Sequence, residues 1–290
     1  MDNSNNTEPA QPGLRTSSLT LLFAFVVAAV CYLALSSQGL SSAVCWTATL
    51  TLLCAVLWIT EALPIPVTAL IPLSLFPVLG VLSFDQVSEA YGSSTVLLVL
   101  GGFILSKAMV KSGAHSRVAL TLVNLFGARS SRNLVFGFMA AAAVLSMWIS
   151  NAATSLMLLP VAYAILDKSK DKQLATPLLL GLAYACSIGG LGTPIGTPAN
   201  LVFRQVYQDV SGIEISFLTW MTWGIPVVLI FLPVVGFWLT RNLNYHGSVD
   251  LPEVGQWSSD EKRVFTIFVI TALAWITRTQ PFGGWSELVG

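Results

Sequence analysis

The chain carries no charged residue between Asn133 and Leu166, and polar side chains interrupt this long apolar stretch near its middle, at Ser150 and Asn151. Polar groups at membrane depth are costly, so they usually face a cavity, a pathway or a ligand.

At about 1.5 Å per helical residue, the stretch is too long for one crossing of a hydrocarbon core about 30 Å thick. Basic residues flank it on both sides, as is typical of cytoplasmic segments: Arg129, Arg132, Lys168, Lys170 and Lys172. The pattern favours a re-entrant helical hairpin over 133–166 with its tip at Ser150–Asn151. The alternative is two short spans joined by an extracellular turn.

The composition is that of a membrane protein. Hydrophobic residues make up 54% of the 290 residues and charged residues only 10%, against about 25% in soluble domains. We therefore expect an all-α polytopic membrane protein in contact with the lipid bilayer. The net charge of zero gives no indication of a nucleic-acid partner. The four cysteines lie in or beside apolar runs without metal-ligand spacing, so we expect them to be apolar fillers.

Apolar runs and charges predict the order of the membrane spans after a polar tail over 1–17. The predicted spans cover 19–35, 44–59, 67–81, a run that starts near Ser94, 174–188, 217–240 and 264–277. Asp85 and Glu89 predict an acidic outer loop, and the run from Ser94 is expected to continue as an amphipathic surface helix. Most basic clusters then lie on the cytoplasmic side, together with the N-terminus. The expected location is the plasma membrane, or the cell inner membrane if the protein is bacterial.

A second polar interruption runs from Gly189 to Asn200, where four glycines and two prolines fall within twelve residues. This composition excludes a regular helix and predicts an unwound break between two half-helices. Half-helix N-termini favour anions, and the carbonyl oxygens of a break suit a hard cation such as sodium. No Lys or Arg lies in the apolar part of a predicted span, so dipoles, hydroxyls and a co-bound cation would hold an anion. The two interruptions together favour a midplane transport site. Each alone also fits a kink or interhelical hydrogen bonding.

A short sequence similarity within the chain indicates an internal repeat. The segment Trp58-Ile-Thr-Glu-Ala-Leu-Pro64 recurs as Trp275-Ile-Thr-Arg-Thr-Gln-Pro281. The first copy ends a span predicted to run inward and the second ends a span predicted to run outward, as in an inverted-topology repeat. A chance match between Trp-rich segments is the alternative.

Several of these motifs carry a family resemblance. They are Leu145–Asn151 followed by Thr154 and Met157–Pro160, then Ile188–Asn200, Trp58–Pro66 and Gly101–Leu105. They closely resemble the hairpin tip, the unwound fifth helix and the second and fourth helices of the divalent anion/sodium symporter family, whose members carry dicarboxylates, citrate or sulfate. The resemblance covers about residues 45–290. It implies a homodimeric secondary transporter with an inverted-repeat, elevator-type fold, and not an enzyme.

The resemblance also implies which residues bind the coupling ion. Sodium would be held by Ser146, Ser150 and Asn151 together with a backbone carbonyl of the break. Gly196 is our first choice for that carbonyl, and Gly192 is the second.

The implied substrate contacts come from both interruptions. They are Ser150, Asn151, Thr197 and Pro198. The chain departs from the family by carrying Ala152 where the family has threonine, which removes a hydroxyl worth about 0.5–1.5 kcal/mol in hydrogen bonding. Thr154 lies on a different helix face and is not expected to replace that hydroxyl. The departure leaves the identity of the anion open.

With the resemblance, the chain divides into six expected parts. They are a cytoplasmic tail (1–17), scaffold helices (18–126), part of a transport domain (127–215, with the hairpin 133–166 and a broken helix 174–209), a sixth span (216–243), a cytoplasmic linker (244–263) and the start of a second repeat (264–290).

The leading hypothesis is sodium-coupled symport of a divalent anion such as succinate, malate, citrate or sulfate. This chain would be the N-terminal half, since the family's second hairpin has no counterpart before Gly290. The alternatives are a cation-independent or proton-coupled anion exchanger of the same fold, or a transport-dead truncated product. A membrane enzyme is disfavoured because no paired aspartates and no nucleophile–base pair lie at membrane depth.

Overall fold

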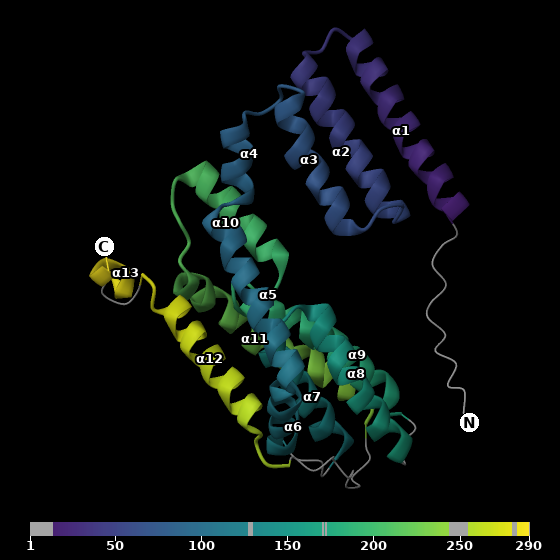
Figure 1. Ribbon diagram of the computed structural model, residues 1–290. Helices are drawn as coiled ribbons and strands as arrows, with labels where there is room; N and C mark the ends of the chain where they lie inside the picture. The colour runs from purple at the N-terminus through teal and green to yellow at the C-terminus, as the bar shows by residue number, and fades with distance from the viewer. Residues whose placement is uncertain are drawn as a thin grey trace, which may run out of the picture. The chain divides into compact units, whose positions relative to one another are not determined.

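The computed structural model describes residues 14–126, 130–169, 171, 173–243, 255–279 and 283–289. Every regular element in these ranges is helical, which confirms the all-α class (Figure 1). The predicted tail up to residue 13 and the linker residues 244–254 lie outside the described ranges.

Five helices in the described residues are long and apolar enough to cross a membrane, as a polytopic membrane protein requires. They are Ser18–Ser37, Ser42–Thr60, Phe84–Ser112, Ala175–Gly192 and Phe217–Thr240. Three shorter apolar helices accompany them: Ile65–Val78, Ser131–Ser146 and Asn151–Asp167. The last two are the arms on either side of the polar residues Ser150 and Asn151.

The chain forms two compact units, and the first extends to Val96. Its helices α1 (Leu14–Ser37) and α2 (Ser42–Thr60) form a hairpin, and α3 (Ile65–Val78) packs against α2. Their common core consists of Ala24, Ala28, Leu50, Leu53 and Leu57. Helix α2 ends because Glu61 adopts a left-handed conformation with φ 49°, just before Pro64.

The prediction of an acidic loop around Asp85 and Glu89 is wrong, because these residues lie in the short helix α4 (Phe84–Tyr91). A capping box starts this helix. The Ser83 hydroxyl accepts from the backbone N–H of Gln86 at 3.2 Å, and the Gln86 side chain accepts from the N–H of Ser83 at 2.9 Å. Both bonds satisfy donors that a helix N-terminus otherwise leaves free.

The second unit runs from Leu97 onward and contains the two polar interruptions. Its elements are α5 (Ser94–Ser112), which begins just before the boundary, α6 (Ala114–Phe126), α7 (Ser131–Ser146), α8 (Asn151–Lys168), α9 (Ala175–Gly189), the 3₁₀ turn η1 (Gly190–Gly192), α10 (Pro198–Ser211), α11 (Phe217–Thr240), α12 (Ser259–Ile276) and α13 (Gly284–Val289). Helix α6 follows α5 directly, as predicted for a helix that continues past the fourth run. The bounds of α9 and α11 agree with the predicted spans to within one residue.

Helix α7 is the centre of this unit and packs against α6, α9 and α11. Its buried side chains include Leu134, Phe138 and Met139. Glycine allows the close approach on both sides: a Cβ on Gly137 would lie 3.1 Å from the Cα of Val123 in α6, and a Cβ on Gly189 would collide with the α7 backbone. Small residues at helix contacts are expected in a bilayer, where tight packing replaces the hydrophobic effect between helices. This packing fixes the end of α7 against the end of α9.

Candidate functional site

The first part of the site is the junction between α7 and α8. Helix α7 ends at Ser146 and α8 begins at Asn151, with Ser150 as its N-cap. The Ser150 backbone is extended, and its hydroxyl accepts from the N–H of Ala153 at 3.3 Å. No acidic residue lies in the first turn of α8. The positive end of the helix dipole is therefore not neutralised locally and favours an anion.

Three uncharged oxygen atoms meet behind this junction. The Oγ of Ser146, which is fully buried, lies 2.5 Å from the Oδ1 of Asn151 and 2.7 Å from the backbone oxygen of Cys186 in α9. The Ser146 hydroxyl has one proton, so it can donate to only one of the two oxygens at a time. The cluster is consequently rich in oxygen lone pairs, as a hard cation requires.

The second part of the site is the break after α9. Helix α9 ends at Gly189, η1 adds one turn, and the chain is unwound from Thr193 until α10 begins at Pro198. Asn200 closes this break from inside: its Nδ2 donates to the oxygens of Gly190 and Thr193, both at 2.8 Å. Asn200 is itself buried. One side chain therefore donates to two backbone acceptors of the break, and the oxygen of Thr193 also accepts from the N–H of Gly196 at 3.4 Å.

Neighbouring side chains tie the break to the hairpin and to α11. The Thr193 hydroxyl donates to the backbone oxygen of Met147 at the hairpin tip. The indole N–H of Trp220 in α11 donates to the oxygen of Leu191 at 2.9 Å. The unwound segment is thus held in one conformation by hydrogen bonds from three side chains, which reduces the cost of irregular backbone at membrane depth.

The glycines of the break allow the two parts to touch. A Cβ on Gly190 would lie 2.6 Å from the Oδ1 of Asn151, which is too close for any side chain. A Cβ on Gly196 would collide with the oxygen of Gly190, and one on Gly192 would lie 2.8 Å from the Cε of Met147. Gly190 and Gly192 therefore leave room for the side chains of Asn151 and Met147 at the hairpin tip, and Gly196 lets the break pack on Gly190.

The predicted site residues form an inner and an outer layer. The inner layer is buried and consists of Ser146, Gly192 and Gly196. Ser150, Asn151 and Thr197 are half-buried, and Pro198 is exposed. Both α8 and α10 begin in this outer layer, and neither carries an acidic residue in its first turn. An anion could approach these helix N-termini from the accessible side.

Ala152, which stands where the family has threonine, and Thr154, two residues later, lie in different surroundings. Ala152 is exposed, whereas Thr154 is fully buried and its hydroxyl has no hydrogen-bond partner among the described residues. The two residues therefore occupy different faces of α8, as the sequence predicts.

The sequence pointed to Ser146 and Asn151, which the structure brings into contact, but not to three groups beside them. These are the backbone oxygen of Cys186, the amide of Asn200 and the hydroxyl of Thr193. A backbone carbonyl has no sequence signature, so the contribution of Cys186 could not be predicted. Asn200 could have been found, because a polar side chain immediately after a Gly/Pro break at membrane depth needs partners.

The described residues contain no group of three His, Cys, Asp or Glu side chains that could hold a transition metal. The chemistry of the site is accordingly that of neutral oxygens and helix N-termini. Neutral oxygens are donors that hard cations accept, and helix N-termini favour anions.

Comparisons with known proteins show which family the chain resembles. A family model described as a citrate transporter (CitMHS) matches residues 55–286. The chain is also similar to proteins named sodium-dependent dicarboxylate transporter SdcS from Staphylococcus aureus strains USA300, NCTC 8325 / PS 47 and COL. Each is 40% identical over 258 residues, which cover 81% of this chain and 49% of the relative. The chain spans about half the length of the curated relatives it matches.

Proposed function

Because the chain belongs to the citrate transporter family of divalent anion transporters, we propose that it supplies the N-terminal half of a sodium-coupled symporter. The proposed substrate is a divalent anion, such as succinate, malate, citrate or sulfate. The observation that carries the proposal is the meeting of the Ser146, Asn151 and Cys186 oxygens behind the N-terminus of α8. The names of the relatives support sodium as the coupling ion and a dicarboxylate as the substrate.

Sodium would occupy the inner layer. Ser146, Ser150 and Asn151 would coordinate it together with a backbone carbonyl of the break, either that of Gly196 or that of Gly192. The oxygen of Cys186 is a further candidate because it already lies within hydrogen-bond distance of Ser146. Neutral oxygens suit sodium, because they coordinate the ion without cancelling its charge.

The anion would bind in the outer layer. The backbone N–H groups at the start of α8 and α10 would face its oxygens, with side-chain contacts from Ser150, Asn151 and Thr197 and packing against Pro198. No fixed cationic side chain is part of this set, so the positive charge of bound sodium would compensate the anion. Anion affinity would then depend on sodium, which is the basis of coupled transport.

The remaining parts of the proposal concern the complete transporter. Residues 18–126 would belong to a scaffold and 127–215 to a mobile transport domain, in a homodimer that works by an elevator movement. The arms α7 and α8 would form a re-entrant hairpin, because each is shorter than the helices long enough to span. The N-terminus would be cytoplasmic and the protein would reside in the plasma membrane, or in the inner membrane of a bacterium.

The test is uptake into proteoliposomes that contain the protein expressed from its complete coding sequence. We expect an inward sodium gradient to drive accumulation of labelled succinate, citrate or sulfate, and replacement of sodium by choline to abolish it. Counterflow without any cation gradient would instead identify an exchanger. No sodium dependence with any of these anions would contradict the proposal.

A further inference from the structure

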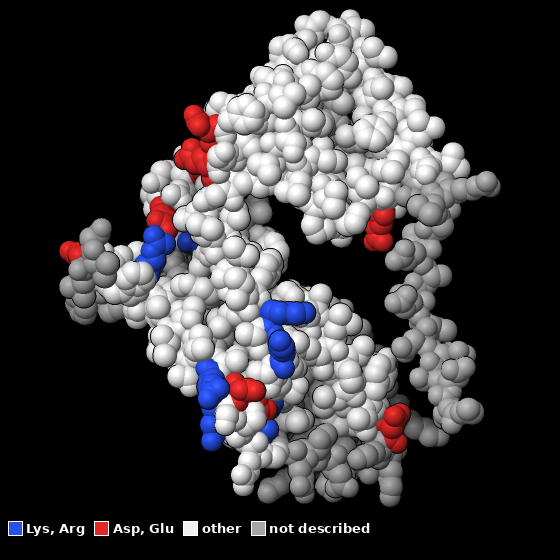
Figure 2. Space-filling view, viewed as in Figure 1, with Lys and Arg blue, Asp and Glu red and all other residues white. Residues whose placement is uncertain are grey.

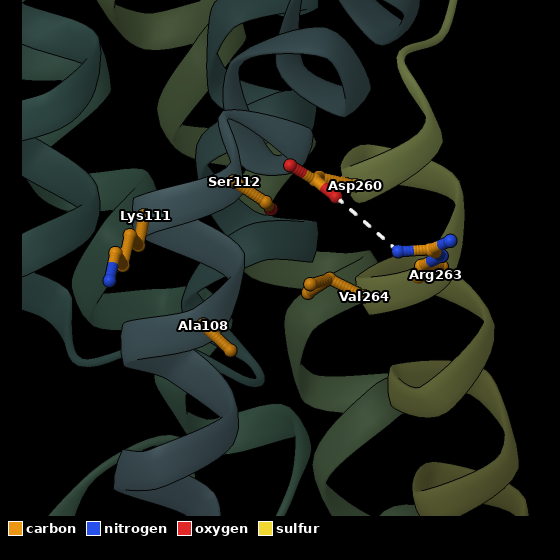
Figure 3. Close-up of a pocket in the computed structure, with 6 residues that line it drawn as sticks. All are labelled: Ala108, Lys111, Ser112, Asp260, Arg263 and Val264. Atoms are coloured by element: carbon orange, nitrogen blue, oxygen red, sulfur yellow. Dashed lines mark ion pairs between the residues drawn. The ribbon is translucent and has the colours of Figure 1, made fainter.

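A small basic pocket lies between α5 and α12, away from the proposed transport site. It encloses about 320 Å³ and is lined by Ala108, Lys111, Ser112, Asp260, Arg263 and Val264. Figure 3 shows Ala108, Ser112 and Val264 around the space between the two helices, while Lys111 and Arg263 extend to opposite sides. The pocket therefore has a mostly apolar lining with Asp260 and Ser112 at its mouth, and the two basic side chains lie on its outer sides.

The pocket lies where both helices change from apolar to polar. Helix α5 ends the candidate span Phe84–Ser112 and carries its two lysines near that end. Helix α12 begins with four charged residues and becomes apolar from Val264 onward. A Cβ on Gly101 would lie 3.6 Å from the ring of Trp275, so the two helices run side by side in opposite directions (Figure 1). Their polar ends consequently lie at the same end of the helix pair, as is typical of helix ends near a membrane surface.

Positive charge dominates around the pocket. Figure 2 shows basic side chains over the end of α5 and the start of α12, with acidic side chains among them. The basic residues of these two helix ends are Lys107, Lys111, Lys262 and Arg263. Within the described ranges, no carboxylate lies within 4.0 Å of any of the three lysines, since the ion pairs found there involve arginines.

The two acidic residues at the start of α12 cancel little of this charge. Glu261 is already engaged by Arg117, with its Oε2 2.9 Å from the Nε. Asp260 lies 3.9 Å from Arg263, but the side chains are 82% and 79% exposed, so this contact is weak. The region is left with an excess of flexible cationic side chains.

Exposed apolar side chains continue from the pocket along both helices. On α5 they include Phe103 and Ile104, and on α12 Ile267 and Ile270, all more than half exposed. A ligand that fits both regions has an anionic group at one end and hydrocarbon at the other.

We propose that this pocket binds the headgroup of an anionic phospholipid. The lipid phosphate would lie at the pocket mouth between Lys111 and Arg263, whose long side chains can turn toward it. The acyl chains would follow the exposed apolar side chains of α5 and α12. Asp260 opposes binding, because it repels the phosphate and competes for Arg263. This site is independent of the proposed transport function.

The test is native mass spectrometry of the protein expressed from its complete coding sequence, in detergent with added phosphatidylglycerol or phosphatidylcholine. We expect preferential retention of phosphatidylglycerol. The double variant Lys111→Ala/Arg263→Ala should weaken it about 25-fold, since each basic side chain near a membrane surface contributes about fivefold in affinity for anionic lipid. The matched control Lys107→Ala/Lys262→Ala removes two charges from the same helices outside the pocket, and its loss should be clearly smaller than that of the pocket double variant, because neither side chain lines the pocket.

A further variant and two further ligands distinguish a phospholipid site from the alternatives. Asp260→Asn should increase phosphatidylglycerol retention, and this gain does not depend on a variant that could fail to fold. Equal losses in the two double variants would assign the effect to diffuse surface charge and overturn the proposal. Equal retention of phosphatidylcholine would also overturn it, as would displacement by inorganic phosphate at constant ionic strength, which would identify a soluble-anion site.

Discussion

The substitution Ser146→Ala tests the proposed sodium site most directly. It removes one buried hydroxyl and changes the side-chain volume very little, so no large cavity forms. In the structure this hydroxyl lies 2.5 Å from the Oδ1 of Asn151 and 2.7 Å from the oxygen of Cys186. The substitution therefore removes one of three meeting oxygens and leaves the other two in place.

The expected effect on stability is small. The oxygen of Cys186 still accepts from the backbone N–H of Gly190, and Asn151 is half-buried, so water can reach its amide. Neither acceptor is left fully unsatisfied, and the loss is that of one ordinary hydrogen bond, about 0.5–1.5 kcal/mol. The expected effect on sodium is larger. An interaction with a charged group contributes about 1.5–3 kcal/mol, which corresponds to a roughly 10- to 150-fold weaker apparent sodium affinity.

The assay is sodium-dependent uptake of succinate into proteoliposomes, measured over a series of sodium concentrations at constant ionic strength. Thermal unfolding with sodium and with choline provides a second measurement that does not need transport. Ser187→Ala is the matched control, because this exposed hydroxyl belongs to α9 next to Cys186 and, among the described residues, donates to the oxygen of Ala183 within its own helix, at 3.4 Å. Its sodium dependence should equal that of the unaltered protein.

Two results would refute the reasoning. Uptake by the Ser146→Ala variant with an unchanged sodium dependence would remove Ser146 from the ion site. A shift of equal size in the Ser187→Ala variant would show that the effect is a general consequence of altering α9 and its surroundings.

Three further predictions concern neighbouring features of the structure. Asn200→Ala removes a side-chain donor from two buried backbone oxygens, of which that of Thr193 keeps a bond from the N–H of Gly196 at 3.4 Å, and should destabilise the protein by about 1–3 kcal/mol in denaturant unfolding, whereas a loss below about 0.5 kcal/mol would contradict the role given to its amide. Ala152→Thr restores an exposed hydroxyl beside the proposed anion position and should lower the substrate concentration for half-maximal uptake by about two- to tenfold, and an unchanged value would place residue 152 outside the contact. Hydrogen bonds from the Ser258 backbone and from Arg117 lower the pKa of Glu261, so the stability they contribute is present above the ordinary carboxyl range and is lost as the pH falls through the lowered pKa. The protection of the first turn of α12 against hydrogen exchange, taken relative to the intrinsic exchange rate at each pH, should therefore fall on acidification, and Glu261→Gln should remove most of that fall.

The helices of this chain could largely be predicted from the sequence, because in a membrane protein apolar length alone identifies most spans. The end of α7 and the start of α8 were also predictable, since Ser150 is a good N-cap residue in an otherwise apolar stretch. Helix α4 was missed because it has only eight residues and its acidic side chains are typical of loops. Its signal was nevertheless present, as Ser83 and Gln86 have the spacing of a capping box.

The candidate site was predictable only in its side chains. Ser146 and Asn151 carry polar groups at membrane depth and could be recognised individually. Their partner oxygen belongs to the backbone of Cys186, whose position depends on how closely α9 packs against α7. The close packing of α9 against α7 depends on glycine at residue 189. The sequence alone does not show which helix packs against a given glycine.

The absence of charged side chains among the predicted site residues has a consequence for coupling in the proposed transporter. An arginine at the position of Asn151 would attract a divalent anion whether or not sodium was present, and burying it would be costly. With neutral oxygens and helix N-termini, the charge of the proposed anion would be fully compensated only when sodium was bound. Thermodynamic linkage makes this effect reciprocal, so the anion must raise sodium affinity by the same factor by which sodium raises anion affinity. Because Ser146 and Asn151 are neutral, the binding of sodium and the binding of the anion would each depend on the other. A permanently charged side chain in their place would weaken that dependence.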